Sequence, residues 1–205
     1  MDPWLELQAR LARVENPWIA ALLRDVIAVR EERLRTWPAA VTVHHAYAGG
    51  LLEHILSVAA AGDALASLYG ADADVVFAGA VLHDIGKLEE LTFEDGAITY
   101  SRDGNLLGHI AMGVVLVRTA ALRITDFPAD LRSCLEHLVV SHHGARPLGS
   151  PVEPMTVEAF ILSAVDDLDA KIHQVRRHVA DDAGEGEFTA FHPRLRRVLF
   201  KPSGR

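Results

Sequence analysis

Apolar side chains recur every three or four residues along most of this chain, which is the spacing of one buried face of an α-helix. Local signals agree with this periodicity: Asn16 and Pro17 suit a helix start, and Gly70 suits a helix end. The sequence therefore predicts an all-α protein. The helices are expected over residues 4–14, 17–36, 49–69, 73–90, 106–122, 129–143 and 155–180.

Two regions depart from the helical pattern. Turn signals at 94–96 and 102–104 flank the short run Ala97-Ile98-Thr99-Tyr100, which predicts a hairpin near 93–103. After Asp181 the chain is polar and Gly-rich, then regains apolar residues between 195 and 200. We expect that tail to pack back onto the protein. The predicted organisation is N-terminal helices over 1–40, a main domain over 41–180 and a tail over 181–205.

Composition narrows the class of protein. Half of the 205 residues are hydrophobic and 23% are charged, which suits a folded core. Cys134 is the single cysteine, so no intramolecular disulfide is expected. The first residues lack the basic start and apolar stretch of a signal peptide, and the uncharged run 104–117 is short for a membrane span. These features predict a cytoplasmic protein with no membrane partner.

The net charge of −8 argues against an extended, sequence-independent nucleic-acid surface, because such a surface is basic. The charge allows a small phosphorylated substrate if metal ions supply positive charge locally. Oligomerisation stays open.

The pair His83-Asp84 stands inside an otherwise apolar, helix-like stretch. A buried carboxylate needs a cation, a metal ion or a proton, because leaving it unpaired is costly. Since both side chains can ligate a metal, the pair predicts a metal site.

Other candidate ligands occur on the apolar faces of separate predicted helices. His54, His109 and His142 lie on or beside apolar stripes, and Asp166 lies at the edge of one. Inward side chains on facing helices are how bundles build metal sites. The predicted ligand set is His54, His83, Asp84, His109, His142 and Asp166. Six ligands exceed what one ion with open positions uses, so two ions are expected, with Asp84 bridging them.

Nitrogen and oxygen donors without thiolate suit Mn, Fe, Co, Ni or Zn. Simpler alternatives remain at this point: His54 and His109 as core histidines, and His142-His143 as a pair closing a helix C-terminus.

Further residues are candidates for contact with substrate. Lys87 follows Asp84 by three residues and reaches the same face, where it would hold a phosphate oxygen, although an ordinary helix-end lysine is the alternative. His143 is rotated by about 100° from His142, toward the edge of the helix. Asp169 and Asp166 face inward one turn apart, so that one can ligate a metal while the other bonds a ligand histidine. His44 and His45 are weaker candidates, with capping or packing as the alternative, and Asp167 is expected to be a solvated charge.

The His, His-Asp and distant Asp pattern resembles the HD superfamily of metal-dependent phosphohydrolases, through His54, His83-Asp84 and Asp166, with His-Asp-Ile-Gly-Lys at 83–87. The resemblance implies an HD-domain helical bundle over 41–180. His109 and His142-His143 resemble the extra ligands of members with two metals.

Within the superfamily, the chain is most similar to bacterial HD-domain 3′→5′ exoribonucleases. The similarity covers roughly residues 40–202 and rests on His44-His45-Ala46-Tyr47, Gly49-Gly50-Leu51-Leu52-Glu53-His54, Gly104-Asn105-Leu106-Leu107-Gly108-His109-Ile110, Ser141-His142-His143-Gly144, Gly149-Ser150-Pro151 and Asp166-Asp167-Leu168-Asp169-Ala170-Lys171. Those nucleases carry an OB-type barrel before the HD domain, whereas the first 40 residues here predict helices. We therefore expect the chemistry to transfer better than the substrate.

The sequence predicts a phosphohydrolase that cleaves phosphoester bonds of a nucleotide or short oligonucleotide. It would act as a phosphodiesterase, nuclease or nucleotidase with two divalent ions, manganese and iron among the candidates. Asp84, Lys87 and His143 are the expected catalytic residues. The alternative is a non-catalytic metal- or nucleotide-binding regulatory module that acts through a partner.

Overall fold

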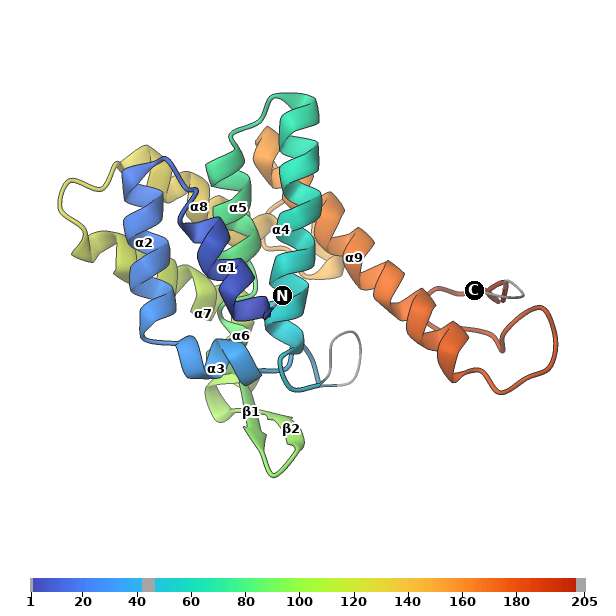
Figure 1. Ribbon diagram of the computed structural model, residues 1–205. Helices are drawn as coiled ribbons and strands as arrows, with labels where there is room; N and C mark the ends of the chain where they lie inside the picture. The colour runs from blue at the N-terminus through green and yellow to red at the C-terminus, as the bar shows by residue number, and fades with distance from the viewer. Residues whose placement is uncertain (1, 42–46, 202–205) are drawn as a thin grey trace.

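The structure is a computed structural model that describes residues 2–41 and 47–201. A helical bundle forms the body (Figure 1), in which α4 (Gly50–Tyr69) and α5 (Ala73–Leu82) pack side by side. The helix α5 is apolar on every side and is buried from Val76 to Leu82. Because a helix without a polar face belongs inside a protein, α5 is the central helix and carries His83 at its end.

The other helices surround this centre. One side is covered by the N-terminal helices α1 (Pro3–Leu11), α2 (Pro17–Ala28) and α3 (Glu31–Thr36). The next two long helices, α7 (Arg102–Arg123) and α8 (Ala129–Ser141), pack against each other. The last helix, α9 (Val157–Asp181), packs across α4 and α5. Buried leucine and isoleucine side chains, including Leu22, Leu51, Ile55, Leu82 and Leu138, join these helices in one core. The all-α prediction is confirmed.

The predicted helix limits shift by up to three residues for helices such as α1, which ends at Leu11 and not at 14, and three predictions change more. The prediction 17–36 is two helices, because the chain turns at Val29–Arg30 and thereby buries Leu34 completely. The prediction 73–90 is interrupted by a turn over 83–86 before the short α6 (Lys87–Glu90). The prediction 106–122 begins earlier, at Arg102, where the Ser101 side chain accepts the Gly104 N–H.

The predicted hairpin is present. Strands β1 (Leu91–Glu94) and β2 (Ala97–Tyr100) pair antiparallel, with Leu91 opposite Tyr100. The turn residues Asp95 and Gly96 both have positive φ, 50° and 78°, as two-residue hairpin turns require. A 3₁₀ turn, η1 (Arg146–Leu148), follows α8.

The outer half of α9 extends away from the bundle, and the tail folds back along it (Figure 1). Lys201 Nζ lies 2.7 Å from Asp182 Oδ1, and Phe188 pairs with Phe200 in a β-bridge. The tail therefore closes on the end of α9.

The helices α4 and α7 are long and apolar enough to cross a membrane by length and composition alone. Half of the apolar window of α4 is buried inside the protein, and so is 22% of that of α7. Core helices of water-soluble proteins pass the same test, so these two helices are weak evidence for a membrane protein.

Candidate metal centre

The turn over 83–86 places the His83-Asp84 pair in the middle of the bundle. Lys87 N–H donates to the Asp84 carbonyl at 2.9 Å, and the turn touches α7 at Gly86. A Cβ atom built on Gly86 would lie 2.0 Å from the His109 carbonyl oxygen. Only glycine allows this approach, which brings Asp84 beside His109.

A first group of donor atoms gathers on one side of Asp84. His54 Nε2 lies 3.1 Å from His83 Nε2 and 3.2 Å from Asp166 Oδ1. Asp84 Oδ2 is 3.4 Å from His83 Nε2. Donor atoms that share one ion at bonds of about 2.1 Å stand about 3.0–3.5 Å apart. His54 Nε2 is within this range of both partners, and His83 Nε2 is 3.8 Å from Asp166 Oδ1, so these three residues form a group that could hold a metal ion, with Asp84 Oδ2 beside it.

The hydrogen bonds of the histidines fix which nitrogen faces the centre. The Nδ1 atoms of His54, His83 and His142 lie 2.8–3.0 Å from Asp169 Oδ2, the Ala80 carbonyl and the Val139 carbonyl. These oxygens can only accept, so each Nδ1 carries the proton and each Nε2 presents a lone pair to the centre. This is the arrangement by which protein groups orient metal-binding histidines.

The contact between His54 and His83 requires a positive charge. Two Nε2 lone pairs at 3.1 Å repel each other unless a proton or a metal ion stands between them. Burial disfavours the charged form of His54, but Asp166 and Asp169 outweigh it and raise its pKa to about 9. The site thus attracts a cation, and a metal ion would replace that proton.

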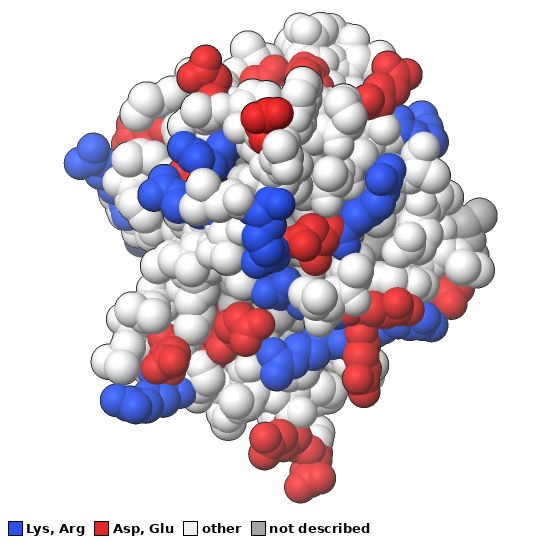
Figure 2. All heavy atoms as spheres, turned by 90° about the vertical axis from the view of Figure 1, so that its left-hand side faces the viewer, with Lys and Arg blue, Asp and Glu red and all other residues white. Residues whose placement is uncertain are grey.

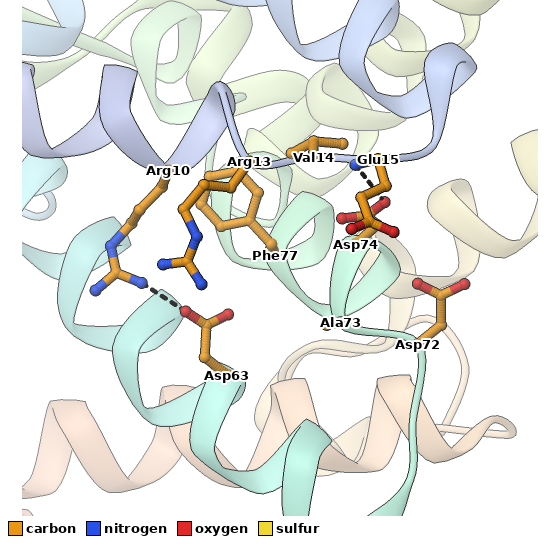
Figure 3. Close-up of a pocket in the computed structure, with 9 residues that line it drawn as sticks. All are labelled: Arg10, Arg13, Val14, Glu15, Asp63, Asp72, Ala73, Asp74 and Phe77. Carbon is orange, nitrogen blue, oxygen red and sulfur yellow. Dashed lines mark hydrogen bonds and ion pairs between the residues drawn. The ribbon is translucent and has the colours of Figure 1, made fainter.

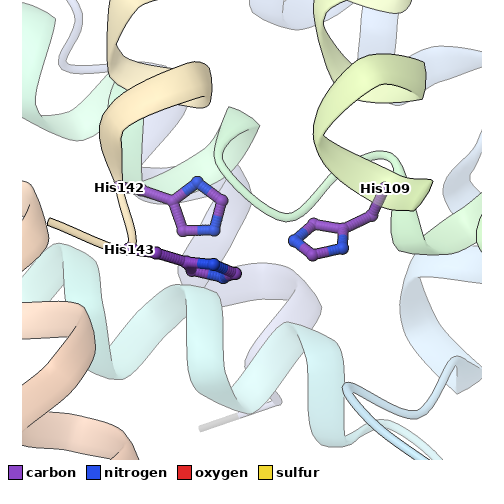
Figure 4. Close-up of side chains that lie close together, drawn as sticks. All are labelled: His109, His142 and His143. Carbon is purple, nitrogen blue, oxygen red and sulfur yellow. The ribbon is translucent and has the colours of Figure 1, made fainter. Parts of the chain in front are cut away.

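A second group lies on the other side of Asp84. His109, His142 and His143 come together at the meeting of α7 with the end of α8 (Figure 4), with donor atoms within 4.8 Å of one another. Asp84 Oδ1 is 3.5 Å from His109 Nε2 and 3.8 Å from His142 Nε2. These three buried atoms have no hydrogen-bond partner among the described residues. Since orphaned buried polar atoms are costly, the group fits a metal ion.

Asp84 and Lys87 carry opposite charges inside this site. Lys87 Nζ donates to Asp84 Oδ2 at 2.6 Å, and both side chains are almost fully buried. Burial opposes the charge on Asp84, but Lys87 and His83 hold the pKa of the carboxyl well below its usual range. Burial likewise opposes the charge on Lys87, and Asp84 raises its pKa. The carboxylate is therefore ionised and able to ligate.

Glu90 supports the second group and is a residue that the sequence prediction missed. Its Oε1 accepts the His109 backbone N–H at 2.9 Å and lies 3.1 Å from His109 Nδ1. A kink in α7 at Gly108, with φ 72° and ψ 158°, exposes that N–H. The available signal was the spacing of Glu90 seven residues after His83, which is the same helical face.

The other residues that the sequence proposed for the site lie around the two groups or away from them. Asp169 bonds His54, and Asp167 is exposed and paired with Lys171. His143 is half-buried beside the second group, and burial lowers its pKa. His44 and His45 lie outside the described residues.

Basic and acidic side chains are interspersed on the side of the molecule shown in Figure 2. Several arginines are engaged in ion pairs between helices, such as Arg118 with Glu136 and Arg123 with Asp25.

Another hollow, of about 540 Å³, lies between α1, α4 and α5 (Figure 3). Arg10 is paired there with Asp63 at 2.6 Å, and Asp74 accepts the backbone N–H groups of Glu15 and Asn16. Neither histidine nor cysteine lines it. Its polar groups hold the helices together, and the metal-binding geometry lies elsewhere.

Comparison with known proteins agrees with the site. The sequence matches the family described as HD domain over residues 51–171. A 3′-5′ exoribonuclease YhaM from Oceanobacillus iheyensis is 37% identical over 202 residues, which is 97% of this chain and 62% of that relative. The 3′-5′ exoribonuclease YhaM of Bacillus subtilis is 37% identical over 177 residues, 86% of this chain and 55% of the relative. The chain thus spans less than two thirds of the relatives' length. No solved structure gave a match.

Proposed function

Because this chain belongs to the HD domain family, we propose that it is a metal-dependent phosphohydrolase that uses two divalent ions to release nucleotides from the 3′ end of short RNA. The ions would be held by His54, His83 and Asp166 on one side and by His109 and His142 on the other, with Asp84 between the two groups.

The observation that carries the two-ion proposal is the position of Asp84. Its Oδ2 faces the first group and its Oδ1 faces the second, where it is buried without a partner among the described residues. A carboxylate with one oxygen toward each group of donors is suited to bridge two ions. Mn, Fe, Co, Ni and Zn all accept such a donor set.

Ions bound there would supply a nucleophilic water and stabilise the negative charge that develops on the phosphate. The protein's own groups complete the chemistry. Lys87 is buried, charged and adjacent to Asp84, so its ammonium group can also contact a phosphate oxygen and add to this stabilisation. His143 is at the open edge of the second group, where it can orient the phosphate or protonate the leaving oxygen.

The substrate assignment rests on the relatives' names and on charge. The relatives are named 3′-5′ exoribonucleases, but the chain covers only part of their length. With 28 acidic against 20 basic residues, it is poorly equipped to hold long RNA by charge alone. Short oligonucleotides, bound mainly through the metal centre, are therefore the proposed substrates.

The experiment is a hydrolysis panel with protein loaded with Mn²⁺. The panel contains RNA and DNA of two to six nucleotides, nucleoside monophosphates and bis-p-nitrophenyl phosphate. The proposal predicts stepwise release of 5′-mononucleotides from the RNA 3′ end and no phosphate release from monophosphates. Release only from monophosphates would make it a nucleotidase, and inactivity toward the whole panel would reject the proposal.

A further inference from the structure

An apolar pocket of about 620 Å³ opens directly beside the second group of histidines. It is formed by α7, the end of α8 and the loop after η1, and it is lined by Leu107, Gly108, His109, Ile110, Ala111, Val114, Val140, His143, Gly149 and Pro151. From this position we infer that the pocket holds the base of the nucleotide whose phosphate is at the metal centre. The inference rests on the proposed function and specifies where the substrate binds.

The lining of the pocket matches the chemistry of a base. Apart from His109 and His143, the lining side chains are aliphatic or absent, and none of them is acidic or permanently basic. A nucleobase has flat apolar faces and is buried most easily between such side chains. The volume is also within the range of roughly 300–1,000 Å³ typical of small-molecule sites.

The pocket adjoins the metal centre, which favours a nucleotide over a purely apolar molecule as its ligand. His109 and His143 line the pocket and also belong to the second group of donors. A ligand that fills both places needs an anionic group at the histidines and a flat apolar group a short distance away. A nucleoside 5′-phosphate has both groups in one molecule.

Gly149 lies directly against His143 in the lining of the pocket. Its φ is positive, 108°, and a Cβ at this position would stand 3.1 Å from His143 Nδ1. A side chain there would crowd His143 where the histidines meet the aliphatic wall. The aliphatic wall would contact the flat face of a base and not the polar edge that distinguishes one base from another. The pocket is therefore expected to bind all four nucleotides with affinities within about tenfold of one another.

The test compares binding of adenosine 5′-monophosphate and ribose 5-phosphate to metal-loaded protein by titration calorimetry. These ligands share the phosphate and sugar and differ by the base. We expect the nucleotide to bind about tenfold more tightly, because its base buries apolar surface against the aliphatic wall. Equal affinities would overturn the inference.

Two neighbouring leucines provide a matched pair of variants. Leu107 lines the pocket and is 61% exposed, while Leu106 is 68% exposed and does not line it. Leu107→Ser is expected to weaken nucleotide binding about fivefold without changing ribose 5-phosphate binding or metal content. Leu106→Ser should leave all three unchanged. Equal behaviour of the two variants would contradict the inference.

A cleavage assay distinguishes failure of this inference from failure of the proposed function. Wild-type protein is given RNA tetramers with either a normal or an abasic 3′-terminal residue. Faster cleavage of the normal tetramer, with the preference reduced in Leu107→Ser, supports the base pocket. Equal cleavage of both tetramers rejects the pocket and leaves the proposed activity intact, whereas cleavage of neither rejects the activity itself.

Discussion

Single side chains determine the metal centre, and Asp84 is the one shared by both groups of donors. The periodicity of the sequence predicted that His54, His109, His142 and Asp166 face inward, and the structure brings them together around Asp84. Periodicity places Glu90 on the same predicted face as His83, but its contact with His109 could not be predicted, because this contact depends on the kink at Gly108. Helical periodicity predicts which face a residue occupies, but not the contacts that a break in a helix creates.

The variant Asp84→Asn tests the shared ligand. The amide keeps the shape and removes the charge that both ions would share, so bound Mn²⁺ should fall to below one ion per chain and hydrolysis by on the order of a thousandfold. Metal analysis after gel filtration and initial rates measure the two effects. The matched control is Asp167→Asn, at the exposed neighbour of Asp166, which should retain both metal and activity. Full metal content in Asp84→Asn would contradict the assignment.

Replacing Glu90 tests the support of the second group alone. Glu90→Gln removes the negative charge beside His109 Nδ1, and changes to such supporting partners typically lower metal affinity by 10- to 100-fold. We expect the weaker of two Mn²⁺ dissociation constants to rise by about that factor, while the tighter one stays within about threefold. Glu89→Gln, whose side chain pairs with arginines at the surface, serves as the control. Equal loss at both sites would argue that Glu90 acts on the fold as a whole.

At the scale of elements, the site depends on a break that the sequence pattern did not predict. Residues 73–90 have continuous helical periodicity, yet the chain turns after Leu82 so that Asp84 faces α7. The cause is tertiary: Gly86 lies against the backbone of His109 and Gly113, which a continuous helix with a side chain at this position would not allow. Local propensity is weak compared with such packing.

The variant Gly86→Ala should separate the His83-Asp84 turn from α7. The added methyl group has no room beside the His109 carbonyl, so we expect destabilisation of about 1–3 kcal/mol and weaker Mn²⁺ binding. Thermal unfolding and metal titration are the measurements. In Gly186→Ala the new methyl group meets nothing closer than 3.8 Å, and this control should unfold like the wild type. Unchanged stability in Gly86→Ala would show that α7 yields easily.

The attachment of the tail to α9 should depend on pH through Asp182. Hydrogen bonds from Lys201 and the Ala190 N–H lower the pKa of this carboxyl from 3.8 to about 2. A lowered pKa favours the folded state above the unfolded value, so the stabilisation is complete above about pH 4 and is lost as pH falls through about 2. The Ala190 amide resonance should follow this transition.

The matched substitutions are Asp182→Asn and Asp181→Asn. Asp182→Asn should loosen the tail at every pH, since the charge that attracts Lys201 is gone. Asp181 is exposed and pairs with Arg177, so its substitution should leave the tail unchanged. A tail that stays attached in Asp182→Asn would mean that the bridge between Phe188 and Phe200 suffices to hold it.

At the scale of the whole molecule, fold class and reaction class followed from the sequence more readily than the substrate did. The all-α architecture and the HD family are confirmed. The substrate depends on surfaces, and the relevant pocket is formed only when α7, α8 and the loop after η1 fold against one another. No periodicity indicates such a surface before the chain is folded. The division into segments 1–40, 41–180 and 181–205 stays a prediction.

Anomalous X-ray scattering from crystals grown with Mn²⁺ tests the two-ion centre most directly. We predict two strong peaks about 3.5–4 Å apart, the separation typical of two-metal hydrolases, with one Asp84 oxygen beside each. The first peak should be contacted by His54, His83 and Asp166, and the second by His109 and His142. A single peak at full occupancy, or two peaks that do not share Asp84, would contradict the account.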